Sequence, residues 1–231
     1  MQKTVRLILG DQLNSNHSWF QTNDDSITYV MMEIRSETDY ATHHIQKIAG
    51  FFSAMRNFAE ELKSKNHNVI YFHLNDATNL QTFDTNIQYL IEKQQFTHFE
   101  YQLPDEYRLD ELLKNFCQSL TISNSAVDSE HFMSSRNELG DFFQGKKTFL
   151  MESFYHMMRK KHNVLMQGDK PLTGKWNYDS DNRKKLPKDH KPTTPLVFNN
   201  DVSEIVSEIN KTNHCCPIKV NKKEAIKWLL N

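Results

Sequence analysis

The sequence predicts a doubly wound α/β domain, with a mostly parallel five-stranded sheet and helices on both of its faces. Two observations predict it. Short apolar, partly β-branched runs alternate along the chain with longer segments in which apolar residues recur every three or four positions. Such alternation builds right-handed βαβ units, and these form a parallel sheet that is covered on both sides. We therefore expect a Rossmann-like domain over residues 1–135, followed by a helical and irregular extension.

The elements of this domain follow in order along the chain. Residues 4–9 are a short apolar run that Gly10 ends, and residues 26–32 are a second strand that ends at Glu33. A long helix follows, with apolar residues at helical spacing from Ala41 to Leu62, and Thr38 or Asp39 can cap its start. The remaining expected elements are strands at 68–73, 97–101 and 120–123 and helices at about 83–91 and 106–120.

The pattern changes beyond residue 135. A helix rich in Phe and Met is expected at 148–162, whereas residues 165–198 lose periodicity and gather glycines and prolines, as in segments that wrap a surface or serve a function. We take 136–200 as a helix with a long basic wrapping segment. Residues 201–231, with short helices expected at 201–211 and 221–230, then form the start of a truncated helical domain.

The overall composition narrows the class of protein. The 28 basic and 29 acidic residues nearly cancel, so no global field favours nucleic acid or a membrane. No apolar run approaches the ~20 residues that span a bilayer, and the first residues do not resemble a signal peptide. The three cysteines show no CxxC spacing, so no metal site is expected. These features predict a cytoplasmic protein without a membrane partner.

Sequence motifs for catalysis are also lacking. The chain has no GxGxxG, no GxxxxGK[ST] and no GxSxG. Neither dinucleotide binding, nor P-loop phosphate binding, nor a serine hydrolase is indicated, and we assign no catalytic residue.

The turn after the first strand is the first candidate binding site, because ligands of open parallel sheets lie at the carboxyl ends of the strands. Gly10 lets the backbone approach a ligand, Asp11 and Gln12 offer polar contacts, and Leu13 follows them. The alternative is a tight turn with a surface Asp.

The second candidate region follows the second strand. Glu33 and Glu37 come first, and on a helical wheel the residues after them form a stripe beside the core stripe, with His43 nearer the solvent. A phenol, an imidazole, an ammonium and an aromatic ring in one stripe suit a heteroaromatic ligand. The alternative is a solvated flank. The stripe consists of Tyr40, His44, Lys47 and Phe51.

A basic segment is the third candidate. Residues 159–191 contain ten Lys or Arg against four Asp, in a chain that is otherwise slightly acidic. Interleaved aromatic residues allow the segment to follow a phosphate backbone, but it could equally dock onto another part of a larger protein or be a solvated loop. The candidate nucleic-acid or domain-docking residues are Lys175, Trp176, Asn177, Arg183, Lys184 and Lys185.

Four stretches in order along the chain resemble signature stretches of a known family. They are LILGDQL at 7–13, YATHHIQKIAGFFSAMRNFA at 40–59, MESFYHMMR at 151–159 and GKWNYDSDNR at 174–183. In these the chain is similar to the prokaryotic photolyase-related proteins, the iron–sulfur bacterial branch of cryptochromes and (6-4) photolyases. The similarity extends over about residues 4–200.

The resemblance implies a role in light collection for DNA repair or light sensing. The family's N-terminal domain is an antenna that binds 6,7-dimethyl-8-ribityllumazine, and its larger helical domain holds FAD and a [4Fe–4S] cluster and acts on DNA. Carried over by motif, the lumazine contacts are Gly10, Asp11, Gln12, Glu33, Glu37, Tyr40, His44, Lys47 and Phe51. The ring of Phe51 is larger than the family pattern leads us to expect, and either stacks on the chromophore or fills part of its space.

The same resemblance leads us to expect that FAD, the cluster and DNA belong to a C-terminal flavin domain absent from a chain ending at Asn231. The chain would then be an isolated antenna domain or a truncated gene product, without catalysis of its own. Two alternatives stay open: a stand-alone α/β protein or enzyme that acts on a nucleotide-like ligand, and a nucleic-acid docking module.

Overall fold

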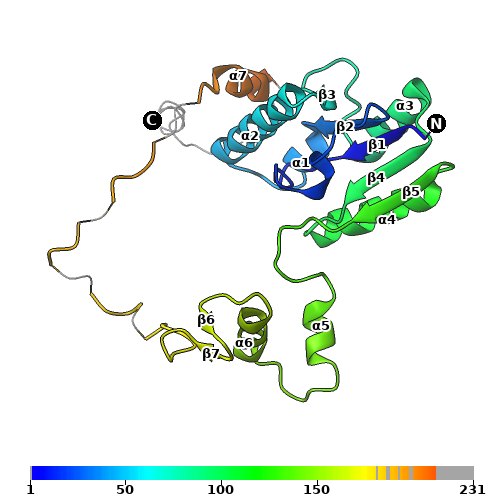
Figure 1. The fold of residues 1–231 in the computed structure, drawn as a ribbon. Coiled ribbons are helices and arrows are strands. Elements are labelled where there is room, and N and C mark those ends of the chain that lie inside the picture. Colours follow the sequence, from blue (N-terminus) through cyan, green and yellow to red (C-terminus); the bar gives the residue numbers. More distant parts are fainter. Residues whose placement is uncertain (1, 181, 186–187, 192, 198–199, 212–231) are drawn as a thin grey trace. The chain divides into compact units, whose positions relative to one another are not determined.

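The computed structural model shows two compact units, which are described separately. The α/β unit comprises Met1–His131 and the segment from Val197 on, and the small unit comprises Phe132–Leu196. The residues that the structure describes are 2–180, 182–185, 188–191, 193–197 and 200–211 (Figure 1).

The α/β unit is built on a five-stranded sheet in which every pairing is parallel, as the sequence predicts. The spatial order is β3-β2-β1-β4-β5. The chain therefore winds outward in one direction from β1 to β3, then crosses back to β4 beside β1. The gap between the ends of β1 and β4 is the switch point at which open sheets of this kind bind ligands. The strands are β1 (Thr4–Leu7), β2 (Ile27–Met32), β3 (Asn68–Phe72), β4 (His98–Gln102) and β5 (Ser123–Val127).

Helices cover both faces of the sheet because successive strand residues point to opposite sides. Tyr29 and Met31 belong to the core under α2 (Ile45–Ser64) and α7 (Ser203–Lys211), whereas Val30 and Met32 belong to the core under α3 and α4 (Figure 1). Each fully buried side chain of this size contributes about 1.5–3 kcal/mol. The bounds of the last two helices are Phe83–Gln94 for α3 and Tyr107–Ser119 for α4.

The fifth strand lies later in the sequence than expected. The apolar run at 120–123 was expected to form it, but β5 is Ser123–Val127, with His98 opposite Ser123 and Gln102 opposite Val127. This strand lies at the edge of the sheet, and its residues SNSAV are mostly small and polar. Pairing with β4, and not hydrophobicity, determines its position.

The start of the long helix also differs from the expectation. Residues 35–38 form a separate short helix, α1 (Arg35–Thr38), and α2 begins only at Ile45. His44 is the N-cap of α2, where its Nδ1 accepts a hydrogen bond from the backbone N–H of Gln46 at 3.2 Å. Thr38, one of the two expected caps, instead donates from its hydroxyl to Asp39 at 2.7 Å.

The small unit contains α5 (Glu138–Phe143), α6 (Met151–Lys161) and the short antiparallel pair of β6 (Met166–Gln167) with β7 (Lys170–Pro171). Arg159 organises it. This side chain is buried, and its guanidinium donates to the carbonyl oxygens of Val164, Leu165 and Trp176 at 2.7–3.1 Å. The segment after α6 is therefore folded against that helix by a charged group.

The last sequence expectations concern the ends of the chain. The expected helix at 201–211 is α7, whereas the one at 221–230 lies outside the described residues. Among the residues that the structure describes, no helix is both long and apolar enough to cross a membrane.

Candidate functional site

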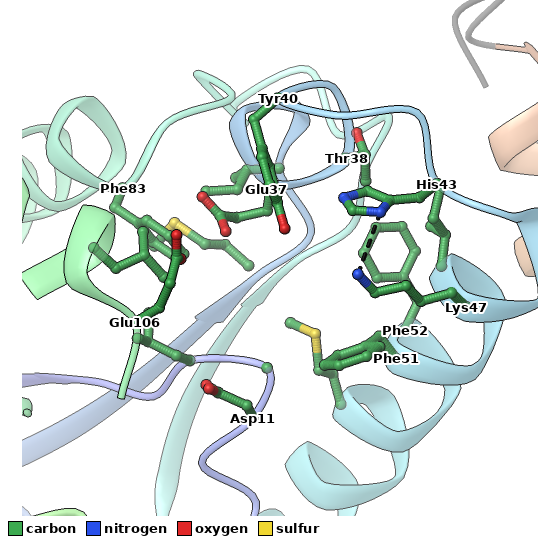
Figure 2. A pocket seen from close by; sticks show the side chains of 17 residues that line it. Asp11, Glu37, Thr38, Tyr40, His43, Lys47, Phe51, Phe52, Phe83 and Glu106 are labelled. Carbon is green, nitrogen blue, oxygen red and sulfur yellow. Dashed lines mark hydrogen bonds between the residues drawn. The ribbon is translucent and has the colours of Figure 1, made fainter. Parts of the chain in front are cut away.

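A cavity of about 200 Å³ opens at the carboxyl ends of β1 and β2, between α2 and the start of α4 (Figure 2). It therefore lies beside the switch point of the sheet. Its walls are mostly apolar, and charged groups surround its mouth. The lining residues are Leu9, Gly10, Asp11, Met32, Ile34, Glu37, Thr38, Tyr40, His43, Lys47, Ile48, Phe51, Phe52, Met55, Phe83, Glu106 and Leu109.

The floor of the pocket is the turn after β1. A Cβ added at Gly10 would lie 3.0 Å from Met55 Sδ and 3.4 Å from the Phe51 ring, so glycine lets α2 approach this turn closely. The buried Gln12 side chain accepts from the backbone N–H of Leu9 at 3.0 Å and donates to the carbonyl of Gln102 at 3.1 Å. Gln12 thus joins the loop after β1 to the end of β4, beneath the pocket.

Two aromatic side chains approach the hollow from different elements. Tyr40 comes from the loop before α2 and Phe51 from α2 itself, and both are about half exposed (Figure 2). Phe51 forms part of the wall, and the cavity of about 200 Å³ remains beside it. Exposed rings at the mouth of an apolar hollow are suited to stacking on a planar ligand.

The mouth carries a cluster of charges centred on Arg108. Its guanidinium makes a bidentate pair with Glu37 at 3.0 and 2.8 Å, contacts Glu106 at 3.0 and 3.1 Å, and lies 4.4 Å from the centre of the Tyr40 ring. Arg108 does not line the cavity, but it holds three residues that do. These contacts tie α1 and the following loop to the start of α4.

The remaining polar groups lie on either side of the hollow. Lys47 Nζ lies 3.2 Å from His43 Nδ1 on the α2 side (Figure 2). Asp11 lies at the end of β1, where partial burial and the nearby carboxylates of Asp105 and Glu106 raise the pKa of its carboxyl. The hollow thus has an ammonium on one side and the Asp11 carboxyl on the other.

Six of the residues proposed from the sequence line this cavity: Gly10, Asp11, Glu37, Tyr40, Lys47 and Phe51. The structure places four others away from it. Gln12 is buried in the turn, Leu13 packs against the core, and His44 caps α2. The expected helical stripe from Tyr40 does not exist because the helix begins after both Tyr40 and His44. His43, expected nearer the solvent, lines the pocket.

Glu33 is the fourth residue that lies away from the cavity. Its carboxylate is fully buried and accepts from Arg56 at 2.7 and 3.0 Å, from the Tyr71 hydroxyl at 2.7 Å and from the backbone N–H of Leu74 at 3.0 Å. Arg56 also pairs with Glu208 of α7. Burial and the Glu33 carboxylate raise the pKa of the Tyr71 hydroxyl, which therefore stays protonated. Glu33 is a structural acceptor that joins β2, β3 and α2.

The same network brings ligand-type atoms of Glu33, His73 and Glu208 within 4.8 Å of one another. Arg56 pairs with both carboxylates, so this group is an ion-pair network and we assign no metal to it.

The start of α4, which follows β4, contributes residues to the site that the sequence analysis does not propose. Glu106 and Leu109 line the cavity, and Arg108 organises its mouth. The signal was available, since these residues follow the strand next to β1 at the switch point. It was missed because the order of strands is not evident from the sequence.

The proposed docking residues lie in the small unit. Lys175, Asn177, Arg183, Lys184 and Lys185 are exposed. Trp176 is partly buried and stacks on the His156 ring with centroids 4.0 Å apart. Asn177 donates to Glu152 at 2.8 Å. The tryptophan is thus part of the packing of this unit, near the cations of Arg159 and Lys160.

The chain is thus an α/β domain of the doubly wound type, with a pocket beside the switch point of its parallel sheet. Over residues 6–222 the chain matches the family model described as deoxyribodipyrimidine photo-lyase-related protein, and it belongs to that family.

Two proteins similar to this chain differ in how much of their own length the chain spans. The chain is 35% identical over 178 residues to a (6-4) photolyase of Agrobacterium fabrum. The matched segment is 77% of this chain but only 35% of the photolyase. It is 25% identical over 194 residues to the uncharacterized protein R852 of Acanthamoeba polyphaga mimivirus. Here the matched segment is 80% of this chain and 96% of the relative. The chain thus spans about a third of one relative and nearly the whole of the other.

Proposed function

We propose that the pocket binds a lumazine-type chromophore and that the chain is the antenna domain of a photolyase-related protein. One observation carries the proposal: an apolar hollow at the switch point has exposed rings of Tyr40 and Phe51 at its mouth and polar groups around them. Stacking on the rings would hold a planar heteroaromatic ligand, while Asp11 and Lys47 would bind its polar edges.

The size of the cavity favours a small ring system. A volume of about 200 Å³ is below the ~300–1,000 Å³ of most sites for drug-sized ligands. A two-ring chromophore such as 6,7-dimethyl-8-ribityllumazine would place its rings inside and its ribityl chain at the open mouth. Phe51 then acts as a stacking wall.

In this role the chain performs no chemistry of its own. A bound lumazine would absorb violet light and pass its excitation to a flavin. We further propose that FAD, the [4Fe–4S] cluster and DNA bind to a flavin domain like the one that the family resemblance implies. The protein would then act in the cytoplasm.

Titration of the purified chain with 6,7-dimethyl-8-ribityllumazine tests the proposal. We expect a violet absorption band that stays with the protein through gel filtration. Tyr40→Ala should weaken binding about tenfold through loss of a stacking ring, a change of ~1.4 kcal/mol. Tyr107→Ala is the matched control, because Tyr107 is exposed and does not line the cavity. Absence of binding at saturating lumazine would refute the antenna role for this chain.

A second candidate function rests on the charge of the small unit. Residues 159–191 carry ten Lys or Arg against four Asp, and Arg183, Lys184 and Lys185 are exposed. We propose that this face docks onto nucleic acid. Binding of a DNA duplex should weaken steeply with salt and with the double change Lys184→Gln and Lys185→Gln. The control is Lys63→Gln with Lys65→Gln at the end of α2. Affinity indifferent to salt would favour docking onto protein.

A further inference from the structure

We propose that the mouth of the pocket is an electrostatic filter that admits ring ligands with an uncharged tail and rejects those with a phosphorylated tail. This inference rests on the proposed chromophore site and concerns which ligands the site selects. It rests on the excess of carboxylates over cations around the opening.

Carboxylates dominate the lining. Asp11, Glu37 and Glu106 line the cavity, and Asp105 is close enough to act on the charge of Asp11. Lys47 is the only Lys or Arg among the lining residues that the structure describes. The Nζ atom of Lys47 lies beside the His43 ring on the α2 side of the hollow. A ligand tail that leaves through the mouth therefore passes several negative charges.

Arg108 does not reverse this balance. Its guanidinium already forms the bidentate pair with Glu37 and the contacts with Glu106, and the Tyr40 ring lies over it. An arginine so engaged offers a phosphate few donors unless it first breaks charge-assisted hydrogen bonds. Arg108 thus acts as a positioning residue for the carboxylates.

Besides Lys47, the start of α4 also favours an anion. A helix N-terminus has an effective charge of about +0.5, which attracts phosphate groups at many sites. Here Glu106, with a full negative charge, is the N-cap residue of α4. The three lining carboxylates outnumber the cations Lys47 and Arg108 by one charge, which exceeds the helix contribution. A tail phosphate with about −1.5 to −2 charges should therefore be repelled.

The experiment compares two ligands with the same ring: 6,7-dimethyl-8-ribityllumazine and its 5′-phosphate ester. The wild-type chain should bind the phosphate ester about tenfold more weakly at low salt, since a few near-surface charge pairs give a repulsion of this order. At 0.5 M salt the two affinities should converge, because screening weakens the repulsion. This salt series needs no mutation.

Variants then test the assignment to particular residues. The double change Asp11→Asn and Glu106→Gln should bring the ratio of the two affinities close to one. Arg108→Gln should increase the ratio, because it removes a positive charge and leaves both carboxylates. Glu111→Gln is the control, since Glu111 lies on the same helix outside the cavity and pairs with Lys114. A ratio measured within one protein is insensitive to a general loss of folded protein.

The outcomes separate this inference from the function on which it rests. Equal affinities for the two ligands at low salt, or tighter binding of the phosphate ester, would overturn the filter and leave the chromophore site intact. A preference for lumazine that persists in the double variant and at high salt would also overturn it. Failure of both ligands to bind would refute the chromophore site and the filter with it.

Discussion

Different kinds of contact stabilise the interior of the α/β unit and the interior of the small unit. In the α/β unit, buried apolar side chains form two layers, one on each face of the sheet. In the small unit, Phe142, Phe143 and Phe154 make edge-to-face ring contacts, and the buried Arg159 holds three carbonyl groups. Hydrophobic burial is spread over many residues, whereas a charged anchor concentrates stability in one. Substitutions should therefore affect the two units very differently.

The largest effect is expected from the ion-pair network around the buried Glu33 carboxylate in the α/β unit. Arg56→Leu would leave the fully buried Glu33 carboxylate without its cation, and should lower the free energy of unfolding by about 3–5 kcal/mol. Urea denaturation measures this change. Lys63→Gln, which removes only an exposed pair with Glu60, should cost less than about 0.5 kcal/mol. Similar decreases in the free energy of unfolding for both variants would show that the buried pair is no more stabilising than the exposed one.

An intermediate and local effect is expected in the small unit. Arg159→Met keeps much of the side-chain volume but removes the donors to three carbonyl groups, and should cost about 2–3 kcal/mol. Hydrogen exchange should rise in peptides of 150–178 and stay unchanged in β1 to β4. Lys160→Met is the neighbouring control. A rise in both units would contradict the view that Arg159 acts within the small unit alone.

The two units also differ in how far their structure can be predicted from the sequence. The sheet and its helices were predictable because apolar residues follow the periods of strand and helix. Ring contacts and buried arginines leave no such period, so the small unit was expected only as a helix and an irregular segment. The same reason explains Glu33: its position after β2 suggested a ligand contact, but its partners Arg56 and Tyr71 come from elements whose proximity only the fold reveals.

Small local errors account for the other differences. Thr38, Asp39 and His44 all could cap a helix. Because α2 begins at Ile45 and not near Ala41, His44 is its N-cap and His43, instead of His44, lines the pocket. β5 was placed too early because an edge strand with few apolar residues is defined by its pairing partner. The pocket itself is partly predictable. Gly10, Asp11 and Glu37 follow from the rule for parallel sheets, whereas Tyr40, Lys47 and Phe51 came from a helical stripe of which only Lys47 and Phe51 lie on α2.

The smallest effect concerns pH and belongs to the α/β unit. His67 is buried against the rings of Phe20 and Tyr29, and this burial lowers the pKa of its imidazole from 6.5. The unfolded chain binds a proton more readily than the folded one, so stability should fall as the pH drops below about 6.5. His67→Phe should flatten the dependence of urea midpoints on pH between 7.5 and 5.5. The exposed His190→Phe should leave it unchanged.

The hydrogen bonds of Gln12 have a consequence for how the site can diversify. Because its amide joins the loop after β1 to the end of β4, the base of the hollow is set by backbone positions and not by the residues that face a ligand. Positions such as 40, 51 and 106 can then be exchanged without disturbing the strands below. A chain built in this way can acquire a new ligand preference by a few substitutions at the mouth, while the folding of the sheet remains unaffected.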